Sequence, residues 1–164
     1  MKKGIPLLVL ATMALPVWSE QVDENTAREV AANILSRSSA LRSSTDSSQE
    51  KSLQLLYKSS SNGENSNSPV RTAQANEIVY FYVFGAENNE GFVIVSGDDR
   101  VTPVLGYSET NGFSADDMPP NLQWWLGEYA KQIQFAIEND IEATSDVRQQ
   151  WAQYLGINDN GEEE

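Results

Sequence analysis

Two neighbouring apolar segments constrain the fold of this chain more than any other feature. Residues 78–85 (IVYFYVFG) and 92–96 (FVIVS) are dense in β-branched and aromatic residues, which is typical of β-strands. The intervening stretch Ala86–Glu90, with Gly91, predicts a hairpin turn between them. The first strand is apolar at every position, whereas a strand with one face in water alternates apolar and polar residues. Both faces of the sheet therefore need cover, which either a partner or, as we expect, the chain's own helices would supply.

The remaining pattern predicts an α+β fold in a single small domain, with an antiparallel sheet of about four strands packed against about three helices. Two further strands are expected at residues 53–58 and 104–107. Apolar periodicity predicts helices at 26–36, from Pro120 to about 138, and at 145–155. Thr26 and Glu29 have the spacing of a capping box at the start of the first helix.

Composition divides the chain into segments. Residues 1–19 carry Lys2 and Lys3 before the apolar run Ile5–Leu15, which predicts an export signal; a membrane anchor is the alternative. We expect the domain to span 20–157 and the protein to be secreted or periplasmic. Stretches 36–50 and 59–68 are rich in Ser and Asn, which predicts flexible connections, and the acidic tail 158–164 is expected to be disordered.

The absence of two residue types limits the chemistry. The 164 residues contain no Cys and no His, which excludes thiol and Ser-His hydrolases and the usual zinc sites. Adjacent acidic pairs at 98–99 and 116–117 are typical of turns rather than of catalytic sites. We therefore expect no enzyme, no metal site and no cofactor.

Net charge restricts the partners. The formal charge of −13 becomes −15 if Lys2 and Lys3 leave with the signal. Such acidity disfavours nucleic acid and, after signal cleavage, anionic membranes, because their phosphates attract Lys and Arg. It permits a basic protein partner, although the charge could equally serve solubility alone.

The long helix has two distinct faces. At about 100° per residue, one face collects apolar residues that should pack on the sheet: Leu122, Trp125, Leu126, Tyr129, Ile133 and Ile137. We expect Trp125 and Tyr129 to be buried there against Phe92 and Ile94. The opposite face, which should meet water, carries Asn121, Trp124, Glu128, Lys131 and Phe135. An exposed Trp and Phe can mark a contact surface; the alternative is that the loop 111–118 covers Trp124.

Five stretches carry a family resemblance. In order and spacing, YFYVF, GFVIVSGDDR, VLGYS, GFSADD and NLQWWLGEYAKQI resemble the propeptide of the streptopain family of papain-like cysteine peptidases, over residues 22–157. The resemblance implies an α+β domain that docks over the active-site cleft of a protease. Because this chain has neither the Cys nor the His of a catalytic domain, it resembles the stand-alone, Spi-like inhibitors of that family.

The resemblance also implies a binding site. In the family, an asparagine near the start of the long helix reaches the active-site region, and Asn121 aligns with it. Together with the water-facing side of the long helix, this alignment predicts the protease-binding residues Asn121, Trp124, Glu128 and Lys131. We expect the chain to be monomeric when free. The predicted partner is a papain-like cysteine protease. The alternatives are a non-catalytic secreted binding module and a propeptide or folding-chaperone remnant of a truncated zymogen.

Overall fold

The computed structural model describes residues 20–37, 53–62, 77–86 and 91–157. Its four strands pair in chain order as one antiparallel sheet: β1 (Leu53–Ser60), β2 (Val79–Ala86), β3 (Phe92–Ser96) and β4 (Val104–Ser108). The described helices are α1 (Glu24–Arg37), α3 (Pro120–Glu138) and α4 (Ser145–Tyr154). The α+β prediction is confirmed. The predicted export signal 1–19, most of the predicted loops and hairpin turn, and the tail 158–164 lie outside the described residues.

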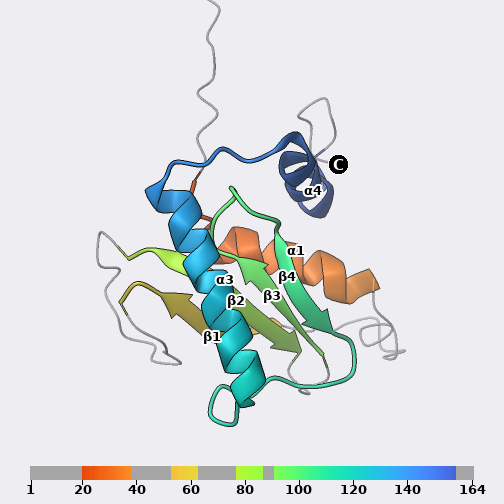
Figure 1. Ribbon diagram of the computed structural model, residues 1–164. Helices are drawn as coiled ribbons and strands as arrows, with labels where there is room; N and C mark the ends of the chain where they lie inside the picture. Colours follow the sequence, from red (N-terminus) through yellow and green to blue (C-terminus); the bar gives the residue numbers. More distant parts are fainter. Residues whose placement is uncertain (1–19, 38–52, 63–76, 87–90, 158–164) are drawn as a thin grey trace, which may run out of the picture.

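Helices of the same chain cover both faces of the sheet, as expected. Figure 1 shows α3 crossing the front of the sheet while α1 lies behind it. One core joins Phe81, Val83 and Ile94 to Leu126 and Ile133 of α3. The other core lies on the opposite face and combines strand residues with α1 and α4: Tyr82, Phe84, Val93, Val95, Val30, Leu35 and Trp151. Full burial of each such side chain contributes about 1.5–3 kcal/mol. Because β2 and β3 contribute side chains to both cores, they hold the helices on both faces of the sheet.

The turn after β3, residues 97–100, connects the sheet to the segment before α1. The backbone N–H of Gly97 donates to the Tyr80 carbonyl at 2.8 Å, and its carbonyl accepts from the Val22 N–H at 2.9 Å. Asp98 is fully buried, and its carboxylate accepts hydrogen bonds from Arg100 Nη1 at 2.9 and 3.2 Å. The turn therefore ties the segment before α1 to the sheet, and its acidic residues are structural, as the sequence indicated.

Two details of the sequence prediction are wrong. The first helix begins at Glu24 and is capped by Asp23. Oδ1 of Asp23 accepts from the Asn25 and Thr26 N–H groups, at 2.8 and 3.2 Å, and Oδ2 accepts from the Thr26 hydroxyl at 2.8 Å. Thr26 thus lies inside the helix and does not form a capping box with Glu29. The hydroxyl of Thr26 is the main cause that lowers the pKa of Asp23 below its usual value.

The second correction concerns the edges of the predicted flexible stretches. Ser36, the last residue of the predicted helix and the first of the predicted loop, belongs to α1, which continues to Arg37. β1 continues through Ser59 and Ser60, which pair with Phe81 and Val79 of β2 and are buried. Backbone pairing to a well-formed neighbouring strand overrides the low strand preference of serine. None of the described helices is long and apolar enough to cross a membrane.

Candidate protein-binding face on the long helix

The start of α3 is set by two prolines. Pro119 precedes the helix and Pro120 is its first residue, where the missing N–H of proline costs nothing. The Pro119 carbonyl accepts from the N–H groups of Leu122 and Gln123, at 2.9 and 3.0 Å. Leu126, Ile133 and Ala136 are buried, and Leu126 and Ile133 pack against the sheet. Since these buried positions lie on one side of the helix, the opposite side faces solvent.

The four predicted site residues all lie on that outward side. Asn121 is exposed, and the indole of Trp124 is 68% exposed. Glu128 Oε1 and Lys131 Nζ form an ion pair at 2.7 Å, with side chains 36% and 73% exposed. The loop 111–118 therefore does not cover Trp124, which excludes the alternative explanation for this residue. We call Asn121, Trp124, Glu128 and Lys131 the outward face.

An exposed Phe extends the apolar part of the outward side. Phe135 is 59% exposed on the helix turn after Lys131. Large exposed aromatic residues flanked by polar groups are a common mark of protein-binding surfaces. The Glu128–Lys131 pair adds little stability because exposed ion pairs contribute about 0–1 kcal/mol. The outward side thus has the composition of a binding surface.

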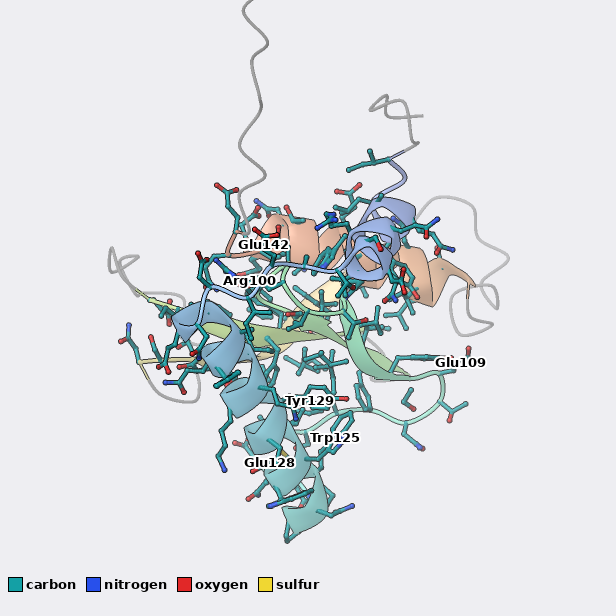
Figure 2. All side chains as sticks on the ribbon, turned by 45° about the horizontal axis from the view of Figure 1, so that its top comes forward. Arg100, Glu109, Trp125, Glu128, Tyr129 and Glu142 are labelled. Atoms are coloured by element: carbon teal, nitrogen blue, oxygen red, sulfur yellow. The ribbon has the colours of Figure 1, made fainter. Side chains whose placement is uncertain are left out.

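Trp125 is less buried than the sequence predicted. Its side chain is 36% exposed, with its ring edge-on to Tyr129 at 4.4 Å between centroids. A Cβ placed on Gly106 of β4 would lie 3.3 Å from the Trp125 ring. Figure 2 shows Trp125 and Tyr129 projecting together from α3 towards β4. β4 is an edge strand of the described sheet, so the sheet provides less cover here than at its centre, in agreement with the partial exposure of the indole.

Of the other residues predicted to be buried at this contact, one is fully buried and two are not. Ile94 is 1% exposed, as expected for a central strand. Phe92 and Tyr129 are only half-buried. The expectation of full burial is therefore right for Ile94 and wrong for the three aromatic residues.

Within the described part of the chain, no group of three or more His, Cys, Asp or Glu side chains could hold a metal ion. Two carboxyl groups outside α3, those of Asp23 and Asp99, have shifted pKa values. For Asp99, burial raises the pKa.

A recess beside the outward face was missed by the sequence analysis. It has a volume of about 160 Å³ and lies between α3 and β1. Tyr57, Ser59 and Phe81 come from the sheet, and Leu126 and Gly127 come from α3. No sequence pattern identifies this recess, because its lining comes from segments far apart in the chain.

Comparisons with known proteins place these features in a family. The model of the family described as Spi protease inhibitor matches residues 19–133, which include the whole sheet and the outward face. The thiol protease/hemagglutinin PrtT of Porphyromonas gingivalis is 28% identical over 150 residues, covering 91% of this chain and 15% of PrtT. Streptopain of Streptococcus pyogenes is 28% identical over 158 residues, covering 90% of this chain and 36% of streptopain. The chain thus spans well under half of either relative. No solved structure gives a significant match.

Proposed function

The chain belongs to the Spi protease inhibitor family, and from this premise we propose that it is a secreted inhibitor of a streptopain-like cysteine protease. The inhibitor docks the outward face of α3 over the active-site cleft of the enzyme. The observation that carries this proposal is the 68% exposed indole of Trp124, in a helix whose other side is anchored in the core. An inhibitor family is non-catalytic, which agrees with the missing Cys and His.

The helix is a suitable element for blocking a cleft. Its buried side packs Leu126 and Ile133 on the sheet, so the outward side chains are presented on a rigid support. A rigid surface loses little conformational entropy on binding, which favours affinity. Trp124 supplies the apolar anchor, and interfaces concentrate their energy in a few such residues.

Asn121 lies one helical turn before Trp124 on the same side and closer to the helix start. Its amide both donates and accepts hydrogen bonds, so it can pair with polar groups in a protease active site. Asn121 therefore acts as a blocking group in this proposal.

Charge supports the choice of partner. The chain carries a formal charge of −13, which attracts a protease with a basic rim around its cleft. The predicted export signal at 1–19 would bring the inhibitor to the compartment of a secreted protease.

The test is an inhibition assay with the two named relatives. Purified protein spanning residues 20–164 is titrated against streptopain and against PrtT. Papain serves as the negative control for selectivity. We expect reversible loss of peptidase activity for at least one of the two relatives and none for papain. Full activity of both relatives at a large molar excess of the protein would contradict the proposed function.

A second function is favoured by the lengths of the relatives. Both are proteases more than twice as long as this chain, so a module of this kind is compatible with a role as a propeptide that assists folding. If the chain assists folding, its addition to unfolded streptopain should speed refolding. The recovered peptidase activity is measured after the chain has been removed. A pure inhibitor would leave the refolding rate unchanged.

A further inference from the structure

Gly127 lies in the interior of α3, at a position where none of the described residues requires glycine. A Cβ placed on Gly127 would have no atom within 4 Å apart from its immediate chain and helix neighbours. Glycine in a helix interior destabilises the helix relative to alanine. Its small size therefore serves no packing purpose inside the part of the domain that the structure describes. The space above it is available to a molecule outside the domain.

This space is the entrance to the recess between α3 and β1. Gly127 and Leu126 form the helix wall, Met118 lies on the loop side, and Tyr57 and Phe81 belong to the sheet. The volume is about 160 Å³. An engineered cavity of about 150 Å³ in another protein binds benzene, so a recess of this size accommodates one side chain.

Ser59 provides a polar group in the same recess. It is only 6% exposed and is part of the recess lining. Its hydroxyl both donates and accepts hydrogen bonds, so a hydroxyl or amide group that enters the recess can pair with it. None of the described residues that line the recess is charged, which makes a charged guest unfavourable because it would be desolvated without an ion partner.

The entrance continues into the outward face. Gly127 follows Trp124 by three residues and precedes Lys131 by four, so these positions are neighbours on the helix surface. A protein that covers Trp124 therefore also covers the entrance. We propose that the recess receives one uncharged side chain of the docked protease, whose hydroxyl or amide end bonds to Ser59. Gly127 keeps the entrance open. This proposal rests on the proposed inhibitor function.

Three substitutions test the recess. Gly127→Leu closes the entrance and should weaken inhibition of whichever relative is inhibited by more than tenfold. Its melting temperature should equal or exceed that of the wild type, because leucine favours the helix and meets open space. Ser59→Ala should weaken inhibition by about 2- to 10-fold, the effect of one hydrogen bond, without lowering the melting temperature. Gly127→Ala should be at least as stable as the wild type and weaken inhibition less than Gly127→Leu.

The matched control is Ala32→Leu. Ala32 is exposed on α1, which covers the other side of the sheet, so the added bulk should leave inhibition unchanged. If Gly127→Leu and Ser59→Ala both inhibit as strongly as the wild type, the recess proposal is overturned. If Trp124→Ala still weakens inhibition in that case, the inhibitor function stands without the recess. A wild-type protein that inhibits neither relative overturns both proposals.

Discussion

Replacement of Trp124 by alanine should separate binding from folding. The indole is 68% exposed in the free protein, so its removal leaves the core intact. A Trp side chain offers about 150–250 Å² of surface, and the exposed two-thirds corresponds to roughly 3–4 kcal/mol if a partner covers it completely. Incomplete cover and ordering costs reduce this to about 2 kcal/mol, the usual effect of an interface anchor. We therefore expect the inhibition constant to rise about 30-fold.

The matched variant is Trp125→Ala, one residue along the same helix. Consecutive residues point about 100° apart, so Trp125 turns towards Tyr129 and Gly106 rather than outwards. Loss of a fully buried Trp costs about 3–5 kcal/mol, and the 36% exposure of Trp125 scales this to about 2–3 kcal/mol. For a domain of this size, that lowers the melting temperature by about 10 °C or more.

Thermal unfolding and the inhibition constant are measured on both variants, with inhibitor concentrations corrected to folded molecules. Trp124→Ala should melt near the wild-type temperature and inhibit poorly, and Trp125→Ala should melt early. A destabilised Trp124→Ala that inhibits normally per folded molecule would refute the assignment of the outward face.

Three further predictions concern stability. Asp98→Ala leaves the nearly buried Arg100 with only the exposed carboxylate of Asp140, at 3.5 Å, and should destabilise the domain by about 3–5 kcal/mol. Unchanged denaturant unfolding would show that the Asp98–Arg100 pair is dispensable. Gly97→Ala places a Cβ 2.3 Å from the Val79 carbonyl oxygen and should lower the free energy of unfolding by about 1–3 kcal/mol or more, as measured by thermal melting. Gly127→Ala, whose Cβ meets no described atom within 4 Å, serves as the control. Asp23→Ala removes the cap of α1 and should cost about 1 kcal/mol at neutral pH. Because the folded-state pKa of Asp23 is lowered, this difference should be complete above the usual value of 3.8 and shrink as the pH falls below it; a pH-independent difference between the two melting curves would contradict the capping role.

Much of the fold and of the outward face was predictable from local sequence patterns. The unbroken apolar character of residues 78–85 required cover on both faces of the strand, and α1 and α3 supply it. The 3.6-residue period of the long helix placed Leu126 and Ile133 inside and Trp124 outside, because a helix converts sequence spacing directly into direction. The family resemblance came from the same strand and helix stretches.

Only the tertiary structure decided where the helix lies across the sheet. Periodicity gives the direction in which Trp125 points, but its burial depends on how far the edge strand β4 extends beneath it. The recess has the same origin: Ser59 and Gly127 are 68 residues apart and meet only because α3 packs beside β1. Even the pairing that buries Ser59 arises from β2 and not from its own neighbours. Local patterns encode which side of an element is apolar, whereas lateral offsets between packed elements come from the fit of many side chains at once.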